Sequence, residues 1–140
     1  MLKDYIKPYY FDGNYNCAET ILRAGNDYYQ LGLHDRDMKL VAAYGAGIQT
    51  GSTCGALLSA AAILSMKYVE QRAHESADIK PVTTMMMERF SQKLGDVMCS
   101  EVKARHFQPG VRCLHTVETA CDVLEEVMAA YDALKEGAAE

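Results

Sequence analysis

Five cysteines are the residues of this 140-residue chain most able to do chemistry: Cys17, Cys54, Cys99, Cys113 and Cys121. A thiolate is both a nucleophile and a metal ligand, so neighbouring thiols could bind a metal or cycle between dithiol and disulfide. No two of them have the Cys-x-x-Cys spacing of local zinc and thioredoxin-like motifs. Any site that they share must therefore be assembled by folding.

Four of the cysteines follow residues that are typical of a helix start. Asn16 precedes Cys17, Ser52-Thr53 precede Cys54, Asp96 lies shortly before Cys99, and Pro109-Gly110 lie shortly before Cys113. Free N–H groups and the positive dipole end of a helix stabilise an anion, which lowers a cysteine pKa from about 8.5. We therefore expect reactive or metal-binding thiols at these four positions.

A glycine-rich segment surrounds the second of these cysteines, at residues 45–56. Glycines before a helix let backbone N–H groups approach a bound anionic centre, as in phosphate and iron-sulfur sites. No Gly-Lys-Ser/Thr follows and no strand precedes the segment, so it is not a phosphate-binding P-loop. We expect Gly51, Thr53 and Gly55 to form a loop that supports Cys54.

The elements that must position these residues are helices. Apolar residues return every three or four positions and strand patterns are nearly absent, which predicts an all-α, single-domain bundle of about five to six helices. The expected elements are an aromatic, irregular arm at 1–13, helices at 16–31, 35–44 and 53–72, a connection at 73–80, helices at 81–94 and 96–105, and a last helix after 110 with a frayed tail at 137–140. The third helix is the most apolar and should be central.

The order of these helices bears on whether the thiols meet. In an up-and-down array the first, third and fifth helices begin at one end, which brings Cys17, Cys54 and Cys99 together. Cys113 would start at the opposite end, but the fifth helix is only about two turns long and the connection at 107–110 could fold back. The topology therefore allows four convergent thiols.

The cysteines and their neighbours resemble the C_GCAxxG_C_C family of redox-active proteins. Cys17 in Asn16-Cys17-Ala18-Glu19 resembles its first cysteine, Cys54-Gly55-Ala56 the second with its motif, and Cys99 and Cys113 the third and fourth. Ser59 stands where the motif has its final glycine, and that glycine would permit close helix packing. The resemblance implies a redox role, with a cysteine-ligated iron-sulfur centre as one form of it.

Two further residues are weaker candidates for the site. Cys121 lies in the apolar stripe of the last helix, two turns beyond Cys113, and core packing explains it best. His106 and His115 flank Cys113, and His115 could supply a nitrogen ligand or a proton, but surface or packing roles explain both histidines better.

Composition restricts the partners. The formal net charge of −5 gives no basic field for a nucleic acid, and the longest uncharged run, residues 54–66, is shorter than the ~20 residues of a membrane span. The first residues lack the apolar stretch of a signal peptide, so we expect a cytoplasmic protein. A redox partner protein is expected, and the tyrosine-rich arm could cover the bundle or form a homo-oligomer face.

These observations leave three functional hypotheses. The first is a redox or electron-transfer protein in which four cysteines bind an iron-sulfur cluster, most simply 2Fe-2S, or cycle as dithiol and disulfide. The second is a bundle with structural zinc on the same four sulfurs. The third is a non-enzymatic interaction module that binds no cofactor and has inert cysteines.

Overall fold

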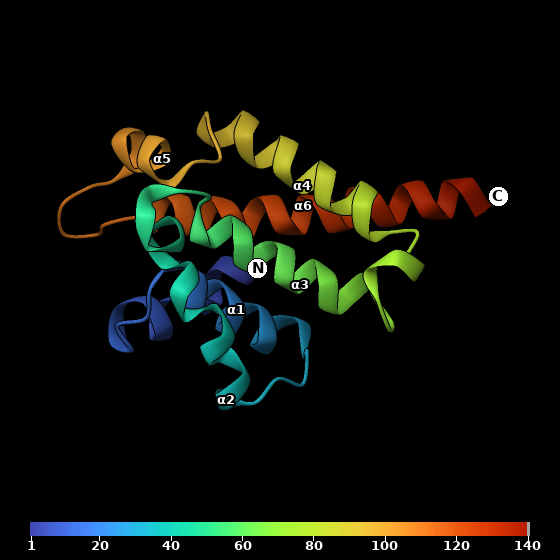
Figure 1. Ribbon diagram of the computed structural model, residues 1–140, viewed down its shortest axis with the longest axis horizontal. Coiled ribbons are helices and arrows are strands. Elements are labelled where there is room, and N and C mark those ends of the chain that lie inside the picture. Colours follow the sequence, from blue (N-terminus) through green and yellow to red (C-terminus); the bar gives the residue numbers. More distant parts are fainter. Residues whose placement is uncertain (140) are drawn as a thin grey trace.

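Helices form nearly the whole of the computed structural model, which describes residues 1–139. The long helices α1 (Cys17–Tyr29), α3 (Gly55–Tyr68) and α6 (Leu114–Ala139) all begin at the left-hand end of the molecule in Figure 1, and α4 (Ile79–Leu94) returns toward it. Two short helices, α2 (Asp35–Met38) and α5 (Cys99–His106), complete the set. Within the described residues, the only β-type pairings are two isolated bridges, so the predicted all-α, single-domain fold is confirmed.

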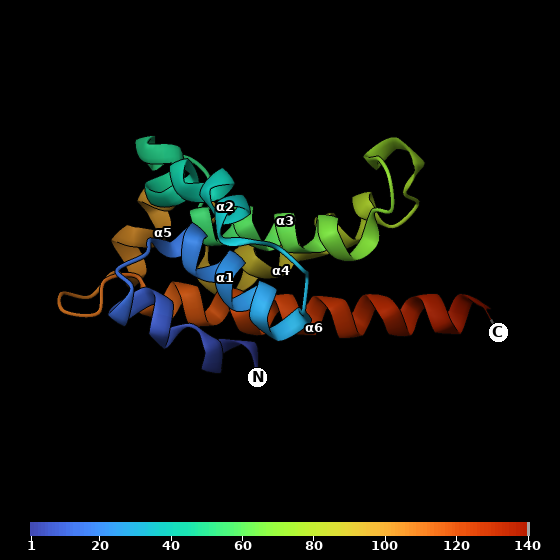
Figure 2. The same ribbon diagram turned by 90° about the horizontal axis from the view of Figure 1, so that it is seen from below.

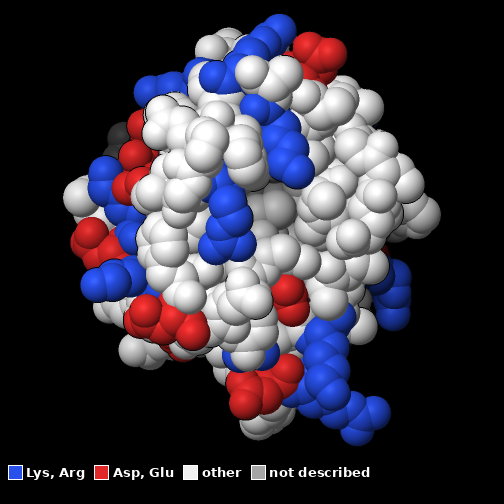
Figure 3. Space-filling model, turned by 90° about the vertical axis from the view of Figure 1, so that its left-hand side faces the viewer, with Lys and Arg blue, Asp and Glu red and all other residues white. Residues whose placement is uncertain are grey.

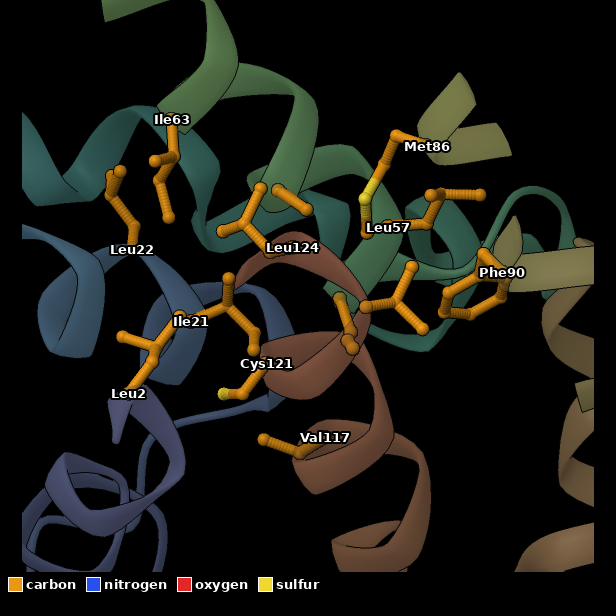
Figure 4. Close-up of a cluster of buried hydrophobic side chains, with 14 of the residues drawn as sticks. Leu2, Ile21, Leu22, Leu57, Ile63, Met86, Phe90, Val117, Cys121 and Leu124 are labelled. Carbon is orange, nitrogen blue, oxygen red and sulfur yellow. The ribbon is translucent and has the colours of Figure 1, made fainter. Parts of the chain in front are cut away.

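The hydrophobic core lies between α1, α3, α4 and α6, which pack on one another along the bundle (Figure 2). Side chains from all four helices and from the N-terminal arm meet there, as the close-up in Figure 4 shows for Leu2, Ile21, Leu57, Phe90 and Leu124. The first two turns of α3 are almost fully buried, which confirms its predicted central place.

Two side chains, those of Asn16 and Glu19, cap the start of α1. The side chain of Asn16 accepts a hydrogen bond from the Glu19 N–H at 2.9 Å, and the Glu19 carboxylate accepts one from the Asn16 N–H at 3.1 Å. This reciprocal capping box, which is typical of two such residues at this spacing, satisfies two N–H groups at the helix start. It fixes the place where Cys17 begins the helix.

Some helix boundaries differ from the prediction. The first helix stops at Tyr29 rather than at residue 31, because Gln30 takes the left-handed conformation that ends it. The third helix begins at Gly55, with Cys54 in the cap position rather than Ser52 or Thr53, and ends at Tyr68. Residues 35–44 form α2 followed by the 3₁₀ turn η3 (Lys39–Tyr44), and the connection at 73–80 contains the turn η5 (Ala73–Glu75).

The two ends of the chain are more regular than expected. The arm forms the short turns η1 (Leu2–Tyr5) and η2 (Pro8–Asp12), because Leu2, Ile6 and Tyr10 are buried at four-residue steps and Pro8 stands at a helix start, where its missing N–H is not needed. At the other end, α6 continues to Ala139 through the segment where a frayed tail was predicted, and Glu140 lies outside the described residues.

Crossing a bilayer requires a long apolar helix. Within residues 1–139, no helix has both the length and the apolar character for it.

Candidate functional site

The structure places four cysteines at the starts of four helices. Cys17 and Cys99 are the first residues of α1 and α5, and Cys54 and Cys113 directly precede α3 and α6. All four helices begin at the same end of the bundle (Figure 1). The start of α6 reaches this end because α5 has only 8 residues and the following loop folds back, as the topology allows.

The four cysteines line one cavity of about 170 Å³. Cys54 is buried, and Cys17, Cys99 and Cys113 are half-buried. The remaining lining residues come from the arm, the cap of α1, the glycine-rich segment, α5 and the start of α6: Tyr10, Asn16, Ala46, Val102, Lys103, Phe107, Arg112 and Thr116. The cavity is several times larger than the ~30 Å³ that one water occupies in the liquid, so it has room for a small group.

Cys17 lies at the centre of the four thiols. Its sulfur faces the backbone N–H groups of Ala18, Ala46 and Ala56, and it is electrostatically coupled to each of the other three cysteines of the cavity. These N–H groups come from the start of α1, from the glycine-rich segment and from the start of α3. Three separate segments therefore direct hydrogen-bond donors at one sulfur, an arrangement that stabilises a bound anionic centre.

Burial nevertheless raises the pKa of three of these thiols, which corrects the prediction that helix starts would lower it there. The pKa of Cys17 is raised by burial, and the N–H of Ala46 only partly opposes this effect. Burial and the neighbouring Cys17 raise the pKa of Cys54 to about 12. The pKa of Cys113 is also raised by burial. Desolvation of the charged form outweighs the N–H groups at Cys17, Cys54 and Cys113, so these three thiols stay protonated without a cation.

The glycine-rich segment forms a strap, residues 45–54, across the cavity. Four successive residues of the strap, Ala46 to Gln49, have positive φ angles of 53°, 63°, 56° and 62°. Each residue with a Cβ costs about 1–2 kcal/mol in this left-handed conformation. The turn places the N–H of Ala46 against the Cys17 sulfur, so the strained backbone serves the site.

Backbone hydrogen bonds fasten the strap to the start of α5. The Cys99 N–H donates to the Ser52 carbonyl at 2.6 Å, and the Cys54 N–H donates to the Val97 carbonyl at 2.8 Å. A Cβ on Gly47 would lie 2.5 Å from the Cβ of Cys99, so only glycine permits this approach. The strap therefore fixes Cys54 and Cys99 relative to each other.

Tyr10 holds the fourth cysteine in place. Its hydroxyl accepts a hydrogen bond from the Cys113 N–H at 2.9 Å. The Arg112 guanidinium lies 4.4 Å from the centre of the Tyr10 ring and donates to the Tyr10 carbonyl at 3.1 Å. The arm thus closes the cavity and ties the end of the α5–α6 loop to it.

The other predicted site residues lie around this cavity rather than in it. Gly51 and Thr53 belong to the strap, and Thr53 pairs with Met98 in an isolated bridge, whereas Gly55 lies directly beside Cys17. His115 is exposed and lies beside His106, with ring centres 5.2 Å apart. Cys121 is fully buried among core side chains in α6 (Figure 4), as predicted for a packing residue.

The site does not have the geometry of a single preformed metal ion. Within residues 1–139, no three His, Cys, Asp or Glu side chains lie close enough together to bind one ion. A zinc ion needs four ligands at about 2.0–2.3 Å, and hence all within a few ångströms of one another. The four thiols surround a larger space instead, and four cysteine sulfurs are the donor set of common iron-sulfur clusters.

Comparison with known proteins agrees with the cysteine pattern. A family profile described as "Putative redox-active protein (C_GCAxxG_C_C)" matches residues 15–127. The chain belongs to the C_GCAxxG_C_C family. No match is found among curated proteins or among solved structures. The region that matches the C_GCAxxG_C_C profile contains all four cysteines of the cavity, so the family motif and the cavity coincide.

The serine at the last position of the C_GCAxxG_C_C motif is compatible with close packing. Ser59 is fully buried, and its hydroxyl donates a hydrogen bond of 2.7 Å to the carbonyl of Ala18. This bond joins α3 to the first turn of α1, beside Cys17. The hydroxyl thus occupies the space that a glycine leaves open and satisfies its own hydrogen bond there.

Tyr10, Lys103 and Arg112 are among the cavity residues that were not singled out from the sequence. Tyr10 was assigned only a general covering role in the arm, and its contact with Cys113 spans 103 positions of sequence. Lys103 stands four residues after Cys99, on the same face of a helix, and Arg112 directly precedes Cys113. Their position beside cysteines was the signal that could have identified these two.

Proposed function

We propose that the protein is a one-electron carrier in which Cys17, Cys54, Cys99 and Cys113 bind an iron-sulfur cluster, most simply of the 2Fe-2S type. The observation that carries this proposal is the cavity of about 170 Å³ lined by all four cysteines. Four cysteine thiolates are the usual ligands of such clusters, which supply reversible one-electron chemistry when bound. Membership of a redox-active family supports the same class of function.

The surroundings of the thiols support a cluster over the two alternatives. A dithiol/disulfide centre needs a thiolate as the attacking species, and burial raises the pKa of Cys17, Cys54 and Cys113 instead. A structural zinc site needs ligands around one point, and the thiols surround a wider space. The N–H groups at Cys17 would donate hydrogen bonds to a ligating sulfur and so raise the reduction potential.

The test is the metal and sulfide content of protein purified without oxygen. We expect coloured protein with iron and acid-labile sulfide in a 1:1 ratio, and loss of both in Cys17→Ser. Cys121→Ala is the matched control, because Cys121 is a buried cysteine outside the cavity, and it should keep the iron.

Two other results would contradict the proposal. Colourless protein with one zinc per chain would favour the structural metal site. Metal-free protein in which two cavity thiols reversibly lose two protons and two electrons to form a disulfide would favour the dithiol centre.

A further inference from the structure

The cysteine cavity reaches the surface beside α5 and the α5–α6 loop. Three of its lining residues, Ala46, Lys103 and Phe107, are exposed. Figure 3 looks at this end of the molecule and shows a wide field of uncharged residues with basic side chains near its middle. A redox centre in the cavity would lie closest to solvent on this face.

The charge at the cavity mouth is opposite to that of the whole chain. Among residues 1–139, Lys103 and Arg112 line the cavity and no acidic residue does, although the chain has a formal net charge of −5. Within the described part of the chain, neither cation has a carboxylate within the 4.0 Å of an ion pair. Both lie over aromatic rings instead, Lys103 over Phe107 at 5.6 Å and Arg112 over Tyr10 at 4.4 Å. They are free to pair with carboxylates from outside.

Large apolar side chains are exposed on the segments that line the cavity. Phe11, Ile48, Met98 and Phe107 are exposed by 40 %, 45 %, 38 % and 42 %. They come from four segments, and each either lines the cavity or lies within two residues of a lining residue. We call these four side chains together with Lys103 and Arg112 the mouth face. Exposed apolar groups gathered around a site are typical of a protein interface.

We propose that the mouth face is the docking surface for an acidic redox partner protein. This inference rests on the proposed function, because the partner would exchange one electron with the centre in the cavity, one protein being oxidised as the other is reduced. Carboxylates of the partner would pair with Lys103 and Arg112 and steer the encounter. The apolar side chains favour a protein over a small anion, because a small anion would leave them in water.

Binding of an acidic one-electron carrier tests this proposal even if the cavity holds no cluster. The probe is a plant-type ferredoxin, which we titrate into the 15N-labelled protein, as purified, at low and at high salt. We expect amide chemical-shift changes at the mouth face and a Kd that rises at least fivefold between low and physiological salt. At low salt, Lys103→Glu should raise the Kd about tenfold above that of the wild type. Lys80→Glu reverses a charge on an exposed lysine at the far end of α4 and should change the Kd by less than twofold.

An apolar pair of variants separates docking from simple charge attraction. Phe107→Ser should weaken binding about fivefold or more, whereas Leu134→Ser, at an exposed leucine far along α6, should not. Equal Kd values for Lys103→Glu and Lys80→Glu, or tighter binding of a DNA duplex than of ferredoxin to the mouth face, would overturn the proposal. Iron and sulfide are measured on the same samples. Docking without a cluster would overturn the proposed function alone, and a cluster without docking would overturn this inference alone.

Discussion

The Cα of Gly55 lies so close to Cys17 that a Cβ at position 55 would stand 2.9 Å from the Cys17 sulfur. The same Cβ would stand 2.5 Å from the carbonyl oxygen of Tyr44. Gly55 is the first residue of α3, and Cys17 is the first residue of α1. The glycine after Cys54 therefore lets two helix starts approach until their cysteines share one cavity.

Replacing this glycine should disrupt the site. Gly55→Ala puts a methyl group against a backbone carbonyl that cannot rotate away, so we expect unfolding to become easier by about 1–3 kcal/mol. The same variant should lose most of its iron, because the methyl group displaces the Cys17 sulfur. Denaturant unfolding and iron analysis measure the two effects. Gly137→Ala is the control, since a Cβ there meets open space, and it should leave both quantities unchanged or slightly raise stability.

Ser59 offers a test of how α1 and α3 are held together near the site. Its buried hydroxyl donates to the Ala18 carbonyl at 2.7 Å. Ser59→Ala removes this hydrogen bond and should cost about 1 kcal/mol of unfolding free energy. Ser59→Gly introduces the glycine of the family motif but adds backbone freedom in a helix. It should therefore lower the unfolding free energy by roughly 1 kcal/mol more than Ser59→Ala does.

Thermal unfolding ranks the three proteins at position 59. The expected order of Tm is wild type, then Ser59→Ala, then Ser59→Gly, with the iron content unchanged in all three. A higher Tm for Ser59→Gly than for the wild type would show that the serine disturbs the helix packing instead.

The hydroxyl of Tyr10 should control the position of Cys113. Tyr10→Phe leaves the Cys113 N–H, 2.9 Å from that hydroxyl, without its partner at the cavity wall. We expect a loss of about 1–2 kcal/mol in stability and faster alkylation of Cys113 in the metal-free protein, read by mass spectrometry. Tyr5→Phe is the control on the same arm, because the Tyr5 side chain is 42 % exposed. Cys113 should be alkylated in this variant at the same rate as in the wild type. Identical rates in the two variants would rule out this role for Tyr10.

The sequence allowed the main features of the fold to be predicted, because they depend on local patterns. Apolar spacing predicts α1, α3, α4 and α6, and the Asn16–Glu19 pair predicts the start of α1. The placement of four cysteines at helix starts also depends on local signals. Their shared end follows from alternating helix directions and from the shortness of α5.

The parts of the site that were not predicted depend on contacts between distant residues. The left-handed turn at Ala46–Gln49 lies in the strap, which backbone bonds from Ser52 and Cys54 fasten to the start of α5, and no local preference favours the turn at Ile48. The pKa directions predicted for Cys17, Cys54 and Cys113 were wrong because helix-start N–H groups can be read from sequence, whereas burial of a thiol depends on the assembled core. Gly55 could be assigned to a supporting loop, but its contact with Cys17 required the packing of α1 on α3.

The last prediction concerns pH and the metal-free protein. Burial raises the pKa of Cys54 to about 12, and burial raises that of Cys121 to about 12 as well. An unfolded cysteine has a pKa of about 8.5, so above that pH the unfolded chain releases protons that the folded chain keeps. Each of these two thiols should therefore lower the unfolding free energy by about 1.4 kcal/mol per pH unit between about pH 9 and pH 12, and by nothing below pH 8.

Variants and metal loading separate the two thiols. In metal-free protein, Cys54→Ala and Cys121→Ala should each make the fall of the unfolding free energy with pH shallower by the contribution of one thiol, about 1.4 kcal/mol per pH unit. Denaturant unfolding at pH 8 to 10.5 measures this slope. Loaded protein should lose the contribution of Cys54 together with those of Cys17 and Cys113, because the ligating thiols would already have lost their protons, whereas the contribution of Cys121 would persist. Loading at pH 7 should also release protons into weakly buffered solution. A loaded protein that keeps the full slope of the metal-free form would show that Cys54 is not a ligand.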